Sequence, residues 1–505
     1  MDRKKKAALG MIPLIAAAFS LVPLAGQAEE PVNLEKTFWT SLAGMYDNPY
    51  FTPAAGASLS PEVLSEWWKV FHDDTLDELI YRALDQNRDL AQAESRLAQA
   101  REALGISKAS LVPWMNAGAG WVRAEAPDGV ISDLSPSALK SFPGTSIDNN
   151  RNLTYAGLDA SWELDFFGKN RSKVKASEKS LEAERGMLYS TWVSLSAEVA
   201  MNYITLRTLQ EELAVTEAHI RNQKENLSLL QINENTGLLS SLPSDQAEYT
   251  LHESEAKIPE LKTEIGETLN RISILTGTVP GALNDRLLAP APLPEIDSAM
   301  YNAIPAEVLR QRPDVHAAEM AWAAQIAKTK EARAEMKPKF SILGVLGLAA
   351  LSGGLFSAGS HAFGIMPQVS YPLFNRGALK RNVRVQSEKE KEKQAAYENT
   401  VLKAAGEVRS AMTAVSQDKV RKDSLEKGRD KAKEALDLSQ NQFSYGLSDY
   451  MGVLDAERHY LSLDQDYTLS KGKELTDMVS LFKALGGGWK PLDEKEEQKV
   501  SENKR

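Results

Sequence analysis

The sequence predicts an α+β fold in which two tandem units each combine a pair of short β-strands with a very long α-helix. Three observations support this fold class. The two halves of the chain match each other at nearly fixed offsets, proline is missing from two long stretches, and short segments before those stretches alternate apolar and polar side chains. Two halves that match along their length indicate a duplication, so we expect both copies to fold into the same order of elements.

The internal repeat organises the chain. Residues 87–97, NRDLAQAESRL, match residues 312–322, RPDVHAAEMAW, at an offset of 225 positions. Further along, SWELDFFG at 161–168 matches SYPLFNRG at 370–377, and this offset of 209 continues without a gap through the rest of the copy. The drop of 16 positions between the two offsets places an insertion within residues 123–153, a segment rich in Pro, Ser, Asp and Asn.

Each copy begins with a predicted amphipathic helix, at residues 74–110 in the first copy and 305–336 in the second. A much longer helix follows the two strands of each copy and begins near Gly168 or Gly377. No proline interrupts either long segment, as an uninterrupted helix requires. Over residues 169 to about 235, such a helix spans ~100 Å at 1.5 Å per residue.

Apolar residues in the first long helix recur every seven positions, with a single step of four. They are Val174, Leu181, Leu188 and Leu195, followed by Val199, Leu206, Leu213, Ile220 and Leu227. Heptads interrupted by a four-residue stutter predict a coiled coil that unwinds locally. An ordinary core helix is a poor alternative, because helices in globular proteins average about 12 residues.

The segments near 154–166 and 362–374 have the pattern of membrane-spanning strands. In the first, Leu158, Trp162 and Leu164 lie on one side, whereas Asp159, Ser161 and Glu163 lie on the other. Alternation over about ten residues with aromatic side chains is typical of a transmembrane strand whose polar face lines a lumen. A soluble sandwich strand is the alternative for a single segment. The strands predicted near 114–122 and 339–348 are rich in glycine and alanine and carry a weaker signal.

The N-terminal residues 1–28 are predicted to be a secretory signal. A basic start at Arg3 to Lys6 precedes a mostly apolar run, and the small residues Gly26 and Ala28 suit a cleavage site. An uncleaved anchor is the alternative. The chain contains no cysteine, so no lipidated N-terminal Cys can follow the signal.

Composition and motifs exclude several function classes. The net charge of −10 argues against nucleic acid, whose affinity comes mainly from neutralised phosphates. The six histidines show no metal-ligand spacing, and no phosphate loop or nucleophile elbow is present. We therefore predict neither an enzyme nor a cofactor or metal site.

Four strands per chain cannot close a membrane barrel, because single-chain barrels begin at eight strands. An open edge in lipid would leave backbone groups unpaired, at a cost of several kcal/mol each. The barrel must then be shared between chains. A trimer would supply twelve strands, but this argument does not fix the number of chains.

Five motifs resemble those of the TolC-like outer-membrane factors, in the NodT/OprM-type branch of efflux channels. They are EWWKVFHDDTLDELIYRALDQNRDL at 66–90, SWELDFFG at 161–168, LRQRPDVHAAE at 309–319, YGLSDYMGVLDAER at 445–458 and ALGGGW at 484–489. The resemblance spans about residues 60–490. It implies a homotrimer with a twelve-stranded barrel in outer-membrane lipid and an α-helical coiled-coil barrel reaching through the periplasm. Many members of this branch carry a lipidated Cys, which this chain lacks.

The resemblance also implies a division of the chain. Repeats at 66–280 and 305–490 follow an N-terminal segment, 29–65, that belongs with the linker 281–304 to an equatorial belt. Residues 491–505 form a charged tail. The partners implied are a periplasmic adaptor protein and an inner-membrane pump, expected to be of the resistance-nodulation-division type.

Two tight turns are the candidate functional sites, because in the family such turns meet the adaptor and the adjoining helices close the pore. Gly237 and Gly446 supply the left-handed geometry that ends a helix. The adaptor-contacting residues implied are Gly237, Leu238, Ser241, Gly446, Leu447 and Ser448. The gate residues implied are Asp455 and Arg458 of the DAER motif, with Met451 as an apolar plug and Leu242 as its repeat equivalent. A surface ion pair is the simpler alternative for Asp455.

The leading functional hypothesis is the outer-membrane exit channel of a tripartite efflux pump for small molecules. The channel of a type I protein secretion system is an alternative within the same class. A periplasmic coiled-coil scaffold without a pore is an alternative from another class, against which the alternating strands argue. A periplasmic hydrolase ranks last.

Overall fold

The computed structural model describes residues 61–125, 150–296, 311–351, 355–356 and 360–491. All of these residues belong to one compact unit that begins at Asn48. The predicted signal segment 1–28 and most of the segment 29–65 lie outside the described residues. So do part of the linker 281–304 and nearly all of the tail 491–505.

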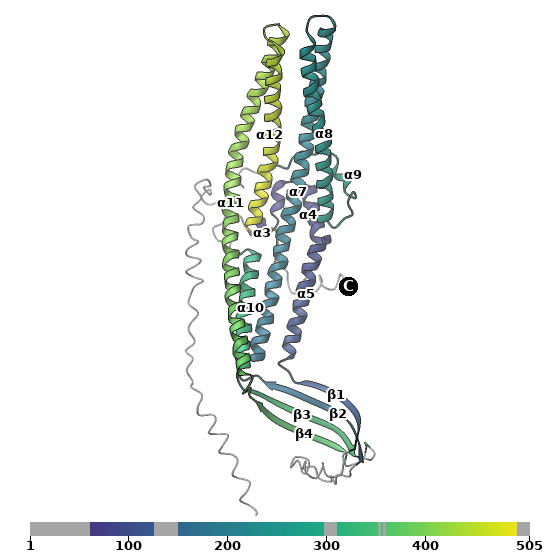
Figure 1. Cartoon of the computed structure of the whole chain (residues 1–505), viewed down its shortest axis with the longest axis vertical. Helices are drawn as coiled ribbons and strands as arrows, with labels where there is room; N and C mark the ends of the chain where they lie inside the picture. Colours follow the sequence, from purple (N-terminus) through teal and green to yellow (C-terminus); the bar gives the residue numbers. More distant parts are fainter. Residues whose placement is uncertain (1–60, 126–149, 297–310, 352–354, 357–359, 492–505) are drawn as a thin grey trace, which may run out of the picture. The chain divides into compact units, whose positions relative to one another are not determined.

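The order of elements repeats along the chain (Figure 1). After the short segments α3 (Pro61–Ser65) and η2 (Trp67–Phe71), the first half contains α4 (Asp74–Gln86), α5 (Arg88–Ala109), β1 (Trp114–Glu125), β2 (Asn150–Leu164), α7 (Lys169–Asn235) and α8 (Ser241–Leu275). The short helix α9 (Asn284–Leu287) follows. The second half contains α10 (Pro313–Glu335), β3 (Lys339–Leu351), β4 (His361–Ser370), α11 (Arg376–Ser444) and α12 (Tyr450–Ala484).

The first helix of each copy differs from its predicted bounds. Residues 74–110 form two helices, α4 and α5, because Asn87 has an extended backbone between them. The Asn87 side chain accepts hydrogen bonds from the backbone nitrogens of Asp89 and Leu90 and so caps α5. In the second copy the described helix begins at Pro313, where proline suits the first helical turn, and residues 305–310 of the predicted helix lie outside the described residues.

The four strands form one antiparallel sheet in the order β1-β2-β3-β4. Its register aligns Leu158 of β2 with Leu346 of β3 and Phe363 of β4, all of which are exposed apolar residues. On the opposite face, Glu163 aligns with Ser341, which in turn aligns with Gln368. The sheet therefore has one apolar face and an opposite face that carries this polar row. Among the described strands, β1 and β4 each leave one edge unpaired.

The strands do not keep all their predicted bounds. β1 and β3 run past the predicted ends of 114–122 and 339–348, because their partners continue the ladder to Glu125 and Leu351. β2 begins at Asn150, four residues before the predicted segment 154–166, and ends at Leu164. β4 ends at Ser370 rather than at residue 374, since its pairing with β3 stops there.

The long helix α7 packs against α4, α5, α8, α10 and α12. The bounds of α7, Lys169–Asn235, are the predicted ones. Seven of the nine heptad residues are buried, and Leu213 and Leu227 are half-buried. The heptad pattern therefore marks the side of α7 that neighbouring helices cover. The second long helix, α11, packs against α10 and α12.

In the core, the first motif meets the end of α12, and the third motif meets the last one. Trp67 stacks on Phe482 with ring centroids 5.3 Å apart. The Arg312 guanidinium donates to the carbonyl oxygen of Ala484 at 2.7 Å and to carboxylate oxygens of Asp314 and Glu407, each at 2.8 Å. These contacts fasten the start of α10 to the end of α12.

Candidate functional site

The candidate site consists of the two turns at which the long helices reverse direction, α7 into α8 and α11 into α12. Gly237 and Gly446 adopt φ values of +75° and +71°. The next backbone nitrogens, those of Leu238 and Leu447, donate to carbonyl oxygens of the preceding helices at 2.9 and 2.8 Å. Each turn therefore ends its helix by the glycine-dependent motif expected from the sequence.

An apolar cluster joins the two hairpins just below the turns. Its buried members are Leu230 of α7, Ala247 of α8, and Tyr450, Val453 and Leu454 of α12. Phe443 of α11 packs against the cluster and meets the Tyr450 ring edge-on at 5.3 Å. All four long helices thus share one small core at this end, so the two tips are coupled mechanically.

The predicted gate residues lie on an exposed side of α12 that adjoins the side buried in this cluster. Met451, Asp455 and Arg458 are all exposed, as their spacing on one helical face predicts. Arg458 donates from Nη2 to the hydroxyl oxygen of Tyr249 on α8 at 3.1 Å. The sulfur of Met451 lies 3.2 Å from Nε2 of Gln246 on the same helix as Tyr249. This face of α12 therefore makes polar contacts with the first hairpin.

Asp455 makes no short ion pair among the described residues. The nearest side chain recorded against its carboxylate is that of His459, whose Nε2 lies 3.8 Å from Oδ1, and both side chains are about three-quarters exposed. An exposed pair of this kind contributes little to stability. The carboxylate is accordingly free to contact another chain or an ion.

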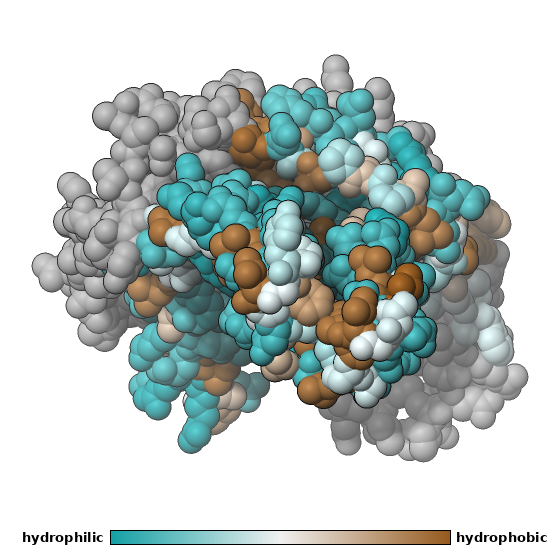
Figure 2. Space-filling view, turned by 90° about the horizontal axis from the view of Figure 1, so that it is seen from above, coloured by the Kyte–Doolittle hydropathy of each residue, from teal (hydrophilic) through white to brown (hydrophobic). Residues whose placement is uncertain are grey.

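Most of the predicted adaptor-contacting residues are exposed at the tips. Leu238 and Leu447, which are equivalent in the repeat, are 74% and 77% exposed. Ser448 is half-buried, and Leu242, which was predicted as a gate residue, is also exposed. Figure 2 views the molecule from the end where the turns lie and shows apolar surface on this end. Exposed leucines at equivalent positions of two turns suit contact with another protein.

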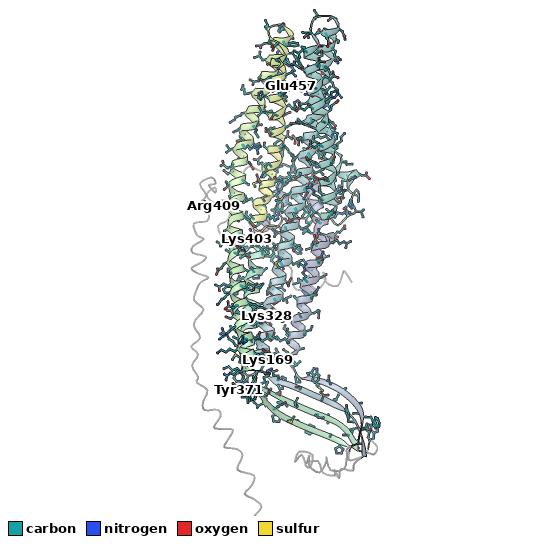
Figure 3. All side chains as sticks on the ribbon, in the orientation of Figure 1. Lys169, Lys328, Tyr371, Lys403, Arg409 and Glu457 are labelled. Carbon is teal, nitrogen blue, oxygen red and sulfur yellow. The ribbon has the colours of Figure 1, made fainter. Side chains whose placement is uncertain are left out.

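A buried polar layer beneath the tips was not among the sequence-based candidates. Glu457 of α12 is buried, and burial raises the pKa of its carboxyl group. The neighbouring Gln223 amide and His219 lower this pKa, but they offset the effect of burial only in part. His219 of α7 forms a 2.9 Å contact from Nε2 to Oδ2 of Asp464. Figure 3 labels Glu457 on this part of α12. With Tyr450, Val453 and Leu454 it follows an i, i+3, i+4, i+7 pattern, which places it on the buried face of α12 and could have identified it.

The described residues contain no group of His, Cys, Asp and Glu side chains that could hold a metal ion. In the same part of the chain, no helix is long and apolar enough to cross a membrane.

Comparison with known proteins identifies the relatives of this chain. The family model described as outer membrane efflux protein matches residues 79–278 and 304–487. The probable efflux pump outer membrane protein SepC of Pseudomonas putida is 29% identical over 84% of this chain and 85% of its own. The toluene efflux pump outer membrane protein TtgI, also of Pseudomonas putida, is 30% identical over 83% of this chain and 86% of its own.

Among solved structures, the outer-membrane channel OprN superposes with a TM-score of 0.79 at 29% identity, covering 87% of this chain and 98% of its own. The fold and the paired hairpin tips therefore define the class as the TolC-like outer-membrane channels, which are not a class of enzymes. The chain belongs to the outer membrane efflux protein family.

Proposed function

We propose that three copies of this chain form the outer-membrane exit channel of a tripartite efflux pump. Each copy contributes four strands to a shared twelve-stranded barrel, and the helices extend the channel into the periplasm. The single observation that carries the proposal is a sheet with an apolar face and unpaired edges at β1 and β4.

The edge argument supports a shared barrel. Each unpaired edge strand exposes a row of backbone donors and acceptors, and lipid offers these groups no partner. If β1 of one copy pairs with β4 of the next, every edge disappears. The outward row of Leu158, Leu346 and Phe363 would then face lipid, and the row of Glu163 and Gln368 would face the lumen.

The hairpin tips would form the closed end of this channel. Threefold symmetry would repeat the exposed face of α12 around one axis and bring three Asp455 carboxylates close together. A ring of carboxylates in a constriction attracts cations. The contact from Arg458 to Tyr249 would hold the two hairpins of each copy together in the resting state. The resting channel would therefore conduct weakly and prefer cations.

The exposed turn residues would contact a periplasmic adaptor, which links the channel to an inner-membrane pump of the resistance-nodulation-division type. Leu238 and Leu447 are the apolar centres of these two contacts. Because the relatives include a protein named for toluene efflux, we propose small molecules rather than proteins as the substrates. No covalent lipid is expected to anchor the protein, since the sequence contains no cysteine.

Planar-bilayer recording tests the proposed function. Purified protein should produce discrete current steps of low conductance, with a reversal potential that favours cations in a salt gradient. The control is the same detergent fraction prepared from cells that lack the protein. Protein that remains folded but never produces current steps would contradict the proposal and favour a scaffold without a pore.

A further inference from the structure

The junction between helices and sheet carries a strong local excess of positive charge. The segments 163–175, 328–339 and 376–387 together contain thirteen Lys and Arg but four Asp and Glu, a net charge of +9, whereas the whole chain carries −10. Figure 3 labels Lys169 and Lys328 in this region, close to Tyr371. Charge of one sign gathered at one level of an otherwise acidic chain indicates an anionic partner.

In the second copy, the segment 376–387 at the start of the long helix carries its positive charge without any acidic residue. In the first copy, the amino group of Lys169 lies 2.6 Å from the Glu163 carboxylate, and Arg171 lies 3.3 Å from Asp165. At the repeat offset of 209, Pro372 and Phe374 replace these two carboxylates, while a cation is retained at the position equivalent to Arg171. The second copy has therefore kept a cation here but not the carboxylates.

Four cations at the start of α11 form what we call the basic stripe. Its members are Arg376, Lys380, Arg381 and Arg384. All four are exposed, and none forms an ion pair within the described part of the chain. The helix dipole also opposes a cation in the first turn, where Arg376 lies. The arrangement is thus unfavourable in the isolated chain and would be relieved by an external anion.

The basic stripe does not face the neighbouring helix. The side of α11 that meets α10 is marked by Gln386, whose Oε1 accepts a 2.8 Å hydrogen bond from Nε2 of Gln325. Arg376, Lys380 and Arg384 are spaced by four residues and form a row on a different side of α11. The cations are therefore available to a binding partner other than α10.

Exposed aromatic residues lie beside the stripe in the sequence. Phe374 is 99% exposed, and Tyr371 and the repeat-related junction residue Phe166 are exposed as well. Along the chain, an apolar strand is followed by exposed aromatic residues and then by cations. Membrane proteins follow this order from the hydrocarbon core through the interface to the charged lipid surface.

We infer that the basic stripe binds the phosphate-bearing headgroups of anionic phospholipids on the membrane surface facing the helices. The inference rests on the proposed function, because that function places the sheet in the membrane. Arg376 to Arg381 span about 7.5 Å along the helix axis, comparable with the ~8 Å over which charges interact at physiological salt. Such contacts would hold the channel at a defined depth without a covalent lipid.

The test compares short-chain lipids that differ in headgroup charge. Dioctanoyl phosphatidylglycerol and dioctanoyl phosphatidylcholine are titrated onto the purified protein in a neutral detergent, and binding is read by native mass spectrometry. The variant replaces all four stripe residues with Gln. The matched control replaces four exposed cations further along α11 with Gln, namely Lys403, Arg421, Lys427 and Lys433.

Wild type and control should bind phosphatidylglycerol at least tenfold more tightly than phosphatidylcholine. The stripe variant should lose at least tenfold of this preference, since a cation near an anionic surface contributes about fivefold. Free glycerol phosphate should not compete at equal concentration. Unchanged lipid preference in the stripe variant would overturn the inference, and effective competition by glycerol phosphate would indicate a site for free anions instead.

Bilayer recording of the same preparations separates this inference from the proposed function. If the stripe variant shifts the reversal potential but keeps its lipid preference, these cations line the pore and the inference is wrong. If wild-type protein binds phosphatidylglycerol selectively but never conducts, the proposed function fails while the lipid site stands. If the wild-type protein conducts, and the stripe variant keeps the cation preference but loses the lipid selectivity, the results support both the proposed function and the lipid site.

Discussion

Replacing Leu454 with Ala should loosen both hairpin tips together. Leu454 is 3% exposed and lies in the apolar cluster that joins α7, α8, α11 and α12. A buried Leu→Ala change typically costs about 2–5 kcal/mol, because the cavity only partly closes. Since the cluster lies beside the turns, we expect the cost to act on local opening of the tips rather than on the whole chain.

Hydrogen exchange measures this opening. A loss of about 2 kcal/mol raises the open population about 30-fold, so amides near both turns should exchange correspondingly faster. Leu447→Ala is the matched control, because Leu447 is 77% exposed and its truncation creates no cavity. Faster exchange confined to the second hairpin, with the first hairpin unchanged, would refute the mechanical coupling of the two tips.

Three further predictions concern α12 and its turn. Asp455→Ala with Arg458→Ala should raise single-channel conductance and vancomycin sensitivity while assembly persists; wild-type values for both would place the constriction elsewhere. Burial raises the pKa of the Glu457 carboxyl group above its usual value of about 4.5. The protonated group therefore stabilises the folded protein below about pH 4.5, and this stabilisation is lost as the pH rises through the raised pKa. Glu457→Gln should therefore raise the Tm at pH 7 by roughly 1–2 °C, and a lower Tm would contradict this account. Gly446→Ala should destabilise its turn by about 1–2 kcal/mol, because φ is +71°. If amide hydrogen exchange at the turn is equally slow in the wild type and in the Gly446→Ala variant, the added methyl group does not strain the backbone at this position.

Two exposed or unstrained positions provide controls for this group. Glu248 is the repeat equivalent of Glu457 but is exposed, so Glu248→Gln should leave the Tm unchanged. Gly452 lies inside α12, and an added Cβ would meet no atom within 4 Å. Gly452→Ala should accordingly be neutral or slightly stabilising, in contrast to Gly446→Ala.

The regular parts of the fold were accessible from the sequence for physical reasons. Heptad repeats and the absence of proline specified α7 to its end residues, because both signals are local and persist over many turns. The break at Asn87 was missed, since the amphipathic pattern continues through it and only the capping side chain reveals the boundary. The far end of β1 was underestimated, because pairing with β2 rather than side-chain pattern extends that strand.

The candidate site was predictable only in part. The spacing of Met451, Asp455 and Arg458 was sufficient to place them on one exposed face of α12. Their contacts with Gln246 and Tyr249 were not predictable, because these depend on how two hairpins about 200 positions apart in sequence align axially. The buried position of Glu457 depends on the same packing. Helical periodicity assigns a face, whereas the neighbouring element decides what that face contacts.

The mass of the native assembly tests the central claim most directly, because the shared barrel requires β1 of one chain to pair with β4 of another. Native mass spectrometry of protein extracted from outer membranes in a mild detergent should give the mass of three chains. A stable single chain under the same conditions would contradict the shared barrel, since its sheet would retain two open edges in the membrane.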